Sequence, residues 1–273
     1  MSANGSPEGA SAVTSARMTG AQYPDLAACP VLVTGGASGI GAAIVRHFAA
    51  QKARVAFLDL RQDAIDALNR DLLQAYGTAA PAAQVDLRDL DATRSAIGAL
   101  AAQVGPFRVL VNNAGDDERH VLETVTPDYW DDRFAVNLRH MFFAAQAVAP
   151  AMAAAGGGSI INLGSISWMF GAAGLVAYTT AKSAVQGFTK SLARELGAAR
   201  IRVNCVAPGM IWTEKQTARA ARDDPGKVQA YLARQCLKEP LDADDVARLV
   251  LWLASAESRH CAGQTFIVDG GVV

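Results

Sequence analysis

Short apolar runs recur along this chain from residue 31 to residue 268, and longer amphipathic segments separate them. The runs are rich in Val, Ile, Leu and Ala, a composition typical of strands that are covered on both faces. Repeated alternation of strands and helices requires crossover connections, which place the strands parallel in one sheet. The seven predicted strands are Val31–Thr34, Val55–Asp59, Ala83–Asp86, Val109–Asn113, Ser159–Leu163, Arg202–Ala207 and Thr265–Val268.

The segments between these runs have the apolar periodicity of helices. The predicted helices include Ala42–Gln51, Ala64–Tyr76, Ala92–Val104, Ala144–Ala155, Val176–Leu196 and Ala243–Ala254. Thr126 followed by Pro127 predicts a further helix start, with Thr126 as the N-cap and Pro127 in the first helical position. The sequence therefore predicts an α/β fold: a single-domain, Rossmann-like doubly wound sheet of about seven parallel strands with helices on both faces.

The N-terminal residues differ from the rest because they are rich in Ser, Ala, Gly and Thr. They lack the charged start and continuous apolar stretch of a secretion signal. We therefore expect a flexible tail over residues 1–26, in which Met18 is an alternative start, and one domain over residues 27–273.

Charge and cysteine content exclude several classes of protein. The chain has 25 basic and 26 acidic residues and no basic run, which argues against nucleic acid or a membrane as a partner. No apolar run reaches the roughly 18 residues that a membrane-spanning helix needs. The four cysteines lie far apart without the spacing of metal ligands, so we expect reduced thiols, no metal and a cytoplasmic location.

The first predicted strand runs directly into a glycine-rich turn, Thr34-Gly35-Gly36-Ala37-Ser38-Gly39-Ile40-Gly41, and a helix follows. The glycines allow a tight turn and close approach of the backbone to a pyrophosphate, and the helix N-terminus offers unpaired N–H groups to the anion. An ordinary strand-to-helix turn is the alternative. The pattern predicts a dinucleotide site with contacts at Gly35, Ser38, Gly39, Ile40 and Gly41.

The second predicted strand ends at Asp59, where a carboxylate can accept hydrogen bonds from the ribose hydroxyls of adenosine. The same carboxylate would repel a 2′-phosphate. Arg61 is close enough to favour a phosphorylated cofactor, but the glycine turn supplies no basic residue. The sequence therefore favours NAD over NADP.

Further motifs follow in a fixed order: Asn112-Asn113-Ala114-Gly115, Ser165, Tyr178-x-x-x-Lys182, and Pro208-Gly209 with Thr213. Together with the turn they resemble the short-chain dehydrogenase/reductase family, from about residue 27 to the C-terminus. The resemblance implies hydride transfer between a substrate carbon and a nicotinamide, and a homotetramer as the assembly. It implies further cofactor contacts at Asp86, Leu87, Asn113, Ala114, Gly115, Tyr178, Lys182, Pro208, Gly209, Ile211 and Thr213.

The predicted catalytic residues are Asn137, Ser165, Tyr178 and Lys182. Tyr178 and Lys182 are four residues apart and share one face of a helix, although a purely structural helix pair is the alternative. A free tyrosine has a pKa of about 10, and we expect the ammonium and an oxidised nicotinamide to lower it. Ser165 can hydrogen-bond the substrate oxygen. By the resemblance, Asn137 kinks its helix and holds a water on a proton path from Lys182.

A charged cluster at residues 116–120 follows Gly115, at the mouth of the sheet where α/β proteins bind ligands. Polar groups there favour a substrate with many hydroxyls over a lipid or an acyl chain, whereas a solvated loop is the alternative. An aromatic face could pack on a sugar, and the segment after Gly209 could close over it. The predicted substrate contacts are Asp117, Arg119, Ser165, Ser167, Trp168, Trp212 and Gln216.

Four segments resemble a narrower group, the bacterial NAD-dependent aldose 1-dehydrogenases such as D-xylose 1-dehydrogenase: residues 115–120, 136–143, 161–168 and 235–238. These enzymes oxidise the anomeric hydroxyl of a sugar to a lactone. The chain departs from the group where Asp116-Asp117-Glu118 replaces the expected Asn-Asp-Asp, and where Met169-Phe170 replaces a more polar pair. The sugar therefore stays open, and L-arabinose, L-rhamnose, L-fucose and D-galactose are among the candidates.

Two other functions fit the same fold. A 3-oxoacyl thioester reductase or general ketone reductase would favour NADP and an apolar or carrier-docking entrance, which Asp59 and the charged mouth oppose. A non-catalytic NAD-binding protein usually lacks a catalytic residue, and none of the four is missing here.

Overall fold

The computed structural model describes residues 20–223 and 226–273 of the chain. Seven parallel strands form one sheet in the order β3-β2-β1-β4-β5-β6-β7, which confirms the predicted fold class. The strands are β1 Pro30–Thr34, β2 Arg54–Asp59, β3 Ala82–Gln84, β4 Val109–Asn112, β5 Gly158–Leu163, β6 Ile201–Pro208 and β7 Thr265–Val268. Each predicted strand is present, within two residues of its expected ends.

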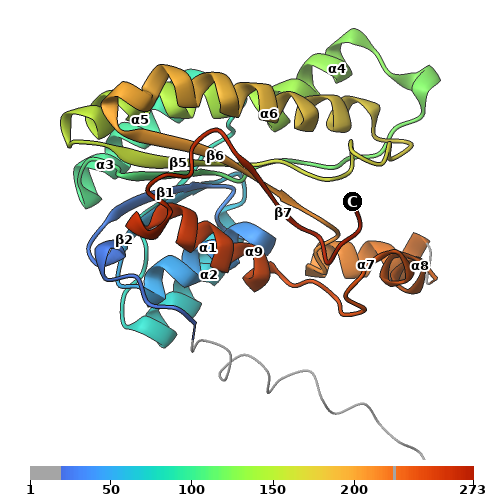
Figure 1. The fold of residues 1–273 in the computed structure, drawn as a ribbon, viewed down its shortest axis with the longest axis horizontal. Coiled ribbons are helices and arrows are strands. Elements are labelled where there is room, and N and C mark those ends of the chain that lie inside the picture. The colour runs from blue at the N-terminus through green and yellow to red at the C-terminus, as the bar shows by residue number, and fades with distance from the viewer. Residues whose placement is uncertain (1–19, 224–225) are drawn as a thin grey trace, which may run out of the picture.

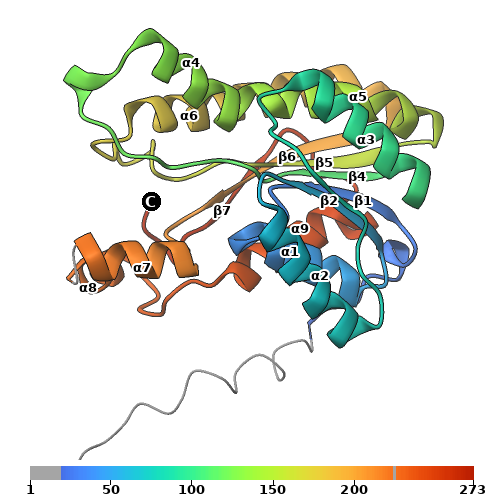
Figure 2. The same cartoon turned by 180° about the vertical axis from the view of Figure 1, so that it is seen from behind.

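Helices cover both faces of the sheet (Figures 1 and 2). One face carries α1 (Gly39–Ala50), α2 (Gln62–Tyr76) and α9 (Ala243–Ala254). The other carries α3 (Leu90–Val104), α5 (His140–Ala154) and α6 (Val176–Leu196). The five central strands between them are almost wholly buried, so their apolar composition follows from two-sided cover. The edge strands β3 and β7 are partly exposed.

The connections place a crevice at the carboxyl ends of the central strands. From β1 the chain winds outward to β2 and β3, and then returns to β4 on the other side. Strand order reverses at this point, and ligands of open α/β sheets bind there. Three helices extend beyond the same edge: α4 (Pro127–Phe134) on one side, and α7 (Glu214–Asp223) and α8 (Lys227–Arg234) on the other (Figure 1). Thr126 caps α4 as predicted, because its Oγ1 accepts a hydrogen bond from the Tyr129 N–H at 3.2 Å.

A chain of buried side-chain hydrogen bonds joins two central strands to α6. The amide of Asn112 on β4 donates to Asn162 Oδ1 on β5 at 2.9 Å, and Asn162 Nδ2 donates to Thr189 Oγ1 on α6 at 3.0 Å. All three residues are buried. Because polar groups without partners are costly in a core, these two hydrogen bonds hold α6 in one register on the sheet.

Part of the predicted N-terminal tail belongs to the folded domain. Residues 1–19, including Met18, lie outside the described residues. Leu26 is buried, and the Tyr23 N–H donates to Gln51 Oε1 at 2.8 Å. The boundary expected after residue 26 was therefore too late, because Leu26 supplies apolar cover for the sheet. Within the described ranges, no helix has the length and apolar character that crossing a membrane requires.

Candidate active site

The glycine turn between β1 and α1 has no room for side chains. Gly35 and Gly39 adopt φ angles of +63° and +54°, which favour glycine. A Cβ atom on Gly41 would lie 1.9 Å from the Gly35 carbonyl oxygen, so any side chain there would displace the turn. The backbone of the turn therefore lines the cleft directly, as close approach to a phosphate requires.

Residues at the end of β4 hold the turn in place. Asn113 Nδ2 donates to the carbonyl oxygens of Thr34 and Gly35 at 3.1 and 2.8 Å. In return, Thr34 Oγ1 accepts from the N–H groups of Asn113 and Ala114 at 3.1 and 3.2 Å. These four hydrogen bonds fix the glycine turn to the end of β4, where the motif Asn112–Gly115 lies.

The N-terminus of α1 suits an anion. Ser38 is the N-cap, but its side chain makes no capping hydrogen bond, and the first turn carries no acidic residue. The carboxylate of Asp59 lies behind the turn, where its two oxygens accept from the N–H groups of Ala37 (2.9 Å) and Arg61 (3.1 Å). The α1 terminus can thus hold a phosphate, while Asp59 is fixed at the end of β2.

A pocket of about 800 Å³ runs from this turn to the mouth of the sheet, a size that accommodates a dinucleotide-scale ligand. Of the predicted cofactor contacts, Gly39 alone does not line it; its Cβ position instead faces the Thr213 methyl group at 3.3 Å. The pocket is also lined by Leu60, Val85 and Arg88, which sequence reasoning missed. The predicted cofactor contacts that line the pocket are Gly35, Ser38, Ile40, Gly41, Asp59, Asp86, Leu87, Asn113, Ala114, Gly115, Tyr178, Lys182, Pro208, Gly209, Ile211 and Thr213.

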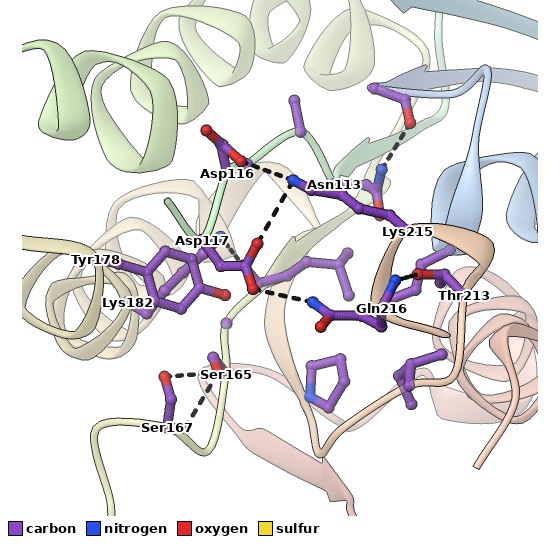
Figure 3. Close-up of a pocket in the computed structure, with 18 of the residues that line it drawn as sticks. Asn113, Asp116, Asp117, Ser165, Ser167, Tyr178, Lys182, Thr213, Lys215 and Gln216 are labelled. Carbon is purple, nitrogen blue, oxygen red and sulfur yellow. Dashed lines mark hydrogen bonds and ion pairs between the residues drawn. The ribbon is translucent and has the colours of Figure 1, made fainter. Parts of the chain in front are cut away.

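Tyr178 and Lys182 project from α6 into this pocket (Figure 3). The Lys182 amine lies 5.8 Å from the centre of the Tyr178 ring and donates to the Leu163 carbonyl oxygen at 2.8 Å. The lysine is buried, and its carbonyl bond anchors the amine at the end of β5.

The expected lowering of the tyrosine pKa is wrong for the protein on its own. Burial raises the pKa of Tyr178 to about 12; the Ser165 hydroxyl acts in the opposite direction, and the Asp117 and Asp116 carboxylates add to the rise. Burial also lowers the pKa of Lys182 to about 8. Desolvation therefore favours the neutral form of both groups, and the protein holds Tyr178 as a phenol.

Asn137 lies behind the pocket wall rather than on it. It sits in a π-helical segment, η3 (Ala135–Arg139), between α4 and α5, which agrees with the expected helix kink. Its Oδ1 accepts from the Asp116 N–H at 2.9 Å, and its Nδ2 donates to the Asp116 and Arg133 carbonyl oxygens. A Cβ on Gly115 would lie 3.0 Å from Asn137 Oδ1 and 3.2 Å from Lys182 Nζ. Glycine at this position lets the two polar groups approach each other.

Ser165 and Ser167 form a hydroxyl pair beside Tyr178 (Figure 3). Ser165 Oγ donates to Ser167 Oγ at 2.9 Å and accepts from the Ser167 N–H at 3.1 Å. Because a hydroxyl can rotate, Ser165 is able to redirect its donor toward a substrate oxygen.

The structure brings five of the seven predicted substrate residues into the pocket: Asp117, Arg119, Ser165, Ser167 and Gln216.

Trp168 and Trp212 do not line the pocket, so both predictions were wrong. Residues 166–171 form a turn, closed by Met169 N–H to Ile166 O at 2.8 Å, that places Phe170 rather than Trp168 on the wall. The Trp212 N–H pairs with the Leu241 carbonyl oxygen at 3.0 Å beside a short strand-like bridge, and its neighbours Ile211 and Thr213 line the pocket in its place.

The sequence did not indicate four further residues that line the pocket. Phe170, Met210, Tyr231 and Arg234 line it, and the Arg234 guanidinium lies 4.5 Å from the centre of the Phe170 ring. The apolar periodicity of α8 held no indication that Tyr231 and Arg234 face a cavity.

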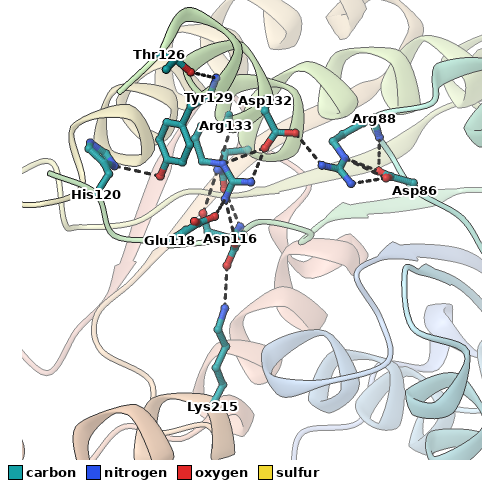
Figure 4. A network of polar contacts seen from close by, with 11 residues as sticks. Asp86, Arg88, Asp116, Glu118, His120, Thr126, Tyr129, Asp132, Arg133 and Lys215 are labelled. Atoms are coloured by element: carbon teal, nitrogen blue, oxygen red, sulfur yellow. Dashed lines mark hydrogen bonds and ion pairs between the residues drawn. The ribbon is translucent and has the colours of Figure 1, made fainter. Parts of the chain in front are cut away.

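A network of alternating charges surrounds the mouth (Figure 4). The buried Arg133 guanidinium contacts Asp116 Oδ2 at 2.9 Å and Glu118 Oε2 at 2.8 Å, and also Asp132. Asp132 Oδ1 in turn contacts Arg88 at 2.7 Å. The cluster predicted from sequence is therefore tied into ion pairs at Asp116 and Glu118, although Glu118 and Arg119 stay exposed.

Comparison with known proteins gives consistent results. Residues 35–273 match the family described as Enoyl-(Acyl carrier protein) reductase (adh_short_C2). The chain is 47% identical over 251 residues to a probable galactose dehydrogenase of Rhizobium meliloti, covering 92% of this chain and 97% of that protein. It is 45% identical over 256 residues to D-xylose 1-dehydrogenase of Caulobacter vibrioides, covering 93% and 99%.

A solved structure shares the fold closely. L-Sorbose reductase from Gluconobacter frateurii, in complex with NADPH and L-sorbose, superposes with a TM-score of 0.84 at 26% identity, covering 90% of this chain and 97% of that one.

The turn geometry generates a direct prediction. Gly41→Ala should raise the dissociation constants of NAD and NADP by about tenfold or more, because displacing the turn removes backbone hydrogen bonds that contribute roughly 1–3 kcal/mol. Equilibrium binding measured by calorimetry checks this. Gly98→Ala is the matched control, since a Cβ on that α3 residue would meet nothing within 4 Å. Unchanged binding by the Gly41 variant would contradict the assignment of the turn.

Proposed function

Because the chain belongs to the short-chain dehydrogenase/reductase family, we propose that it oxidises the C1 hydroxyl of an aldose with NAD, giving the sugar lactone. One observation carries the proposal most: Tyr178 and Ser165 share a pocket wall with Asp117 and Gln216, so the catalytic groups face hydrogen-bonding side chains. The names of the galactose and xylose dehydrogenases support the same substrate class.

The pocket fits a nicotinamide dinucleotide, since the crowded glycines of the turn, the α1 N-terminus without a side-chain capping bond, and Asp59 all lie on its lining. When bound, the nicotinamide accepts a hydride from the substrate, and in its oxidised form it carries a positive charge. The phosphates would contact the turn at Gly35–Gly41, and the adenosine ribose would contact Asp59. Lys182 would hold the second ribose through its amine.

The roles of the chain's own residues follow from their positions. Ser165 donates to the C1 oxygen and holds it beside Tyr178. Tyr178 takes the hydroxyl proton, a general-base step that requires its pKa to fall from about 12. Lys182 has a pKa near 8, so it can pass a proton onward at neutral to alkaline pH. We assign Asn137 to the continuation of this path, because it lies next to Lys182 across Gly115.

Asp59 supports the choice of NAD. Both of its oxygens are held by backbone N–H groups, so the carboxylate is ordered before a cofactor arrives. The Arg61 guanidinium lies 4.0 Å from Asp63 and is largely exposed, which leaves the Asp59 charge without a close cation to offset it. A 2′-phosphate at this position would be repelled.

We also propose that the protein assembles as a homotetramer through α5 and α6. Phe142 and Val176 are each 46% exposed on these helices. Phe142 packs edge-on against Phe143, with ring centres 5.2 Å apart, and lies 6.3 Å from Phe188. An exposed aromatic group on long paired helices is suited to cover by a second copy.

The activity prediction is tested with a panel of pentoses, hexoses, 3-oxoacyl thioesters and short ketones, followed at the nicotinamide absorbance. We expect NAD reduction with one or more aldoses and a lactone as the product, detected by mass spectrometry. Tyr178→Phe should abolish turnover but retain NAD binding, because it removes only the proton acceptor. Turnover confined to thioesters or ketones would refute the aldose assignment.

The cofactor prediction is tested through Asp59. The unmodified enzyme should have a higher kcat/KM with NAD than with NADP. Asp59→Asn should lower the ratio of these two kcat/KM values by about 10- to 100-fold, which is the effect of one charge-assisted hydrogen bond. Asn retains an acceptor for the Ala37 N–H, so the turn is preserved. An NADP preference in the unmodified enzyme would overturn the role of Asp59.

The assembly prediction is tested by sedimentation. We expect a species of four 28.5-kDa chains, and Phe142→Ser should shift it to smaller species because it removes apolar contact area. Leu73→Ser is the control, since Leu73 is 57% exposed on α2, which we do not place at an interface. A monomer in both the parent and the variant would dismiss the proposed interface.

A further inference from the structure

Asp116 lies between two cations from opposite sides of the mouth (Figures 3 and 4). Its Oδ2 contacts Arg133 of α4 at 2.9 Å, and its Oδ1 contacts Lys215 of α7 at 2.8 Å. Its backbone is held as well, since both its N–H and its carbonyl oxygen bond the Asn137 side chain. Asp116 is therefore a fixed anchor, to which Lys215 reaches across the pocket.

A second pair of contacts reinforces the first. Lys215 Nζ lies 3.5 Å from Asp117 Oδ1, and Gln216 Nε2 donates to Asp117 Oδ2 at 2.9 Å. Consecutive residues of α7 thus contact consecutive residues of the segment after β4. All four side chains line the pocket, at the end where Ser165 and Tyr178 lie.

The sequence of α7 makes these polar contacts important. Its apolar residues are three alanines, Ala218, Ala220 and Ala221, and the rest are charged or polar. The sequence of this helix thus offers no large apolar side chain, so polar contacts matter more for placing its start. There, the Thr213 carbonyl oxygen accepts from the Thr217 N–H at 2.9 Å, which ties the first turn to the loop after β6. In the same turn, Lys215 and Gln216 make the ion pairs and the hydrogen bond to the mouth.

We propose that Asp116 and Lys215 form an ionic latch that positions α7, and with it Gln216, over the sugar-binding end of the pocket. Both are positioning residues, and their effect on catalysis rests on the proposed function. An asparagine at position 116 would remove the negative charge that both cations share.

The two cations beside Asp116 keep its carboxyl group ionised, as the latch requires. Burial opposes ionisation of Asp116, but the hydrogen bonds and charges of Lys215 and Arg133 outweigh it and lower its pKa. The Lys215 side chain is 59% exposed, so water and salt compete for it. The Arg133 side chain is buried, so its contact is less open to water, whereas the exposed Lys215 contact can open to admit a substrate.

The test uses Lys215→Met, Asp116→Asn and the double variant of the full chain. Each single change should raise the KM for the sugar by about two- to fivefold, with a smaller effect on kcat and little on NAD affinity. The double variant should be no worse than the more affected single one, because both remove the same contact. Raising the salt concentration should increase the KM of the parent enzyme but not that of Lys215→Met.

Hydrogen exchange tests the latch without a substrate. The amides of residues 214–223 should exchange faster in both single variants than in the parent, by a similar factor. Arg94→Met is the matched control, since it removes an exposed ion pair with Asp91 on α3, outside the pocket. Unchanged exchange in α7, or additive effects of the two substitutions, would overturn the latch. Faster exchange in a protein that oxidises no sugar would support the latch and refute the proposed function.

Discussion

Amide side chains at the carboxyl ends of β4 and β5 hold the two halves of the site in one frame. Asn113 fixes the glycine turn, and Asn112 and Asn162 fix α6 through Thr189. The turn and the Tyr178–Lys182 pair are far apart in sequence, yet neighbouring strands connect them. Each buried hydrogen bond contributes about 1 kcal/mol, but an unpaired amide in this core would cost more. The frame therefore tolerates few substitutions.

Within this frame, desolvation sets the protonation states. Tyr178 and Lys182 are both driven toward their neutral forms, and the carboxylates at the mouth oppose a phenolate further. The chain alone does not activate its base. In the proposed reaction an oxidised nicotinamide would supply the missing positive charge, and proton removal would then be coupled to the presence of the correct cofactor form. Lys215 also favours the phenolate form of Tyr178, because its positive charge offsets those of the Asp116 and Asp117 carboxylates.

The parts of the structure that follow local rules could be predicted from the sequence. The strands, the turn and the α4 cap each depend on residues within a few positions of one another, and they are present where expected. The third strand was expected to reach Asp86 but ends at Gln84, because Gln84 pairs with Asp59, the last residue of its neighbour β2.

Contacts between distant segments could not be predicted. The buried Arg133 looks like an ordinary surface residue in sequence, since its partners at positions 116 and 118 come from another element. Trp168 was expected on the pocket wall because an aromatic group follows Ser165, but turn geometry selects Phe170 instead. The Tyr178 pKa was expected to fall because the charges of Lys182 and of an oxidised nicotinamide were considered without the cost of burial.

The two ends of the pocket differ in what stabilises them, and this difference bears on specificity. The cofactor end is built from backbone and buried amides, whereas the α7 side of the substrate end rests on exposed pairs that contribute about 0–1 kcal/mol each. Substitution of Lys215 therefore changes the charge of the mouth at little cost to the fold. A family with one reaction can acquire many substrates in this way, because selection can act on the mouth while the frame that places the phenol and the dinucleotide stays fixed.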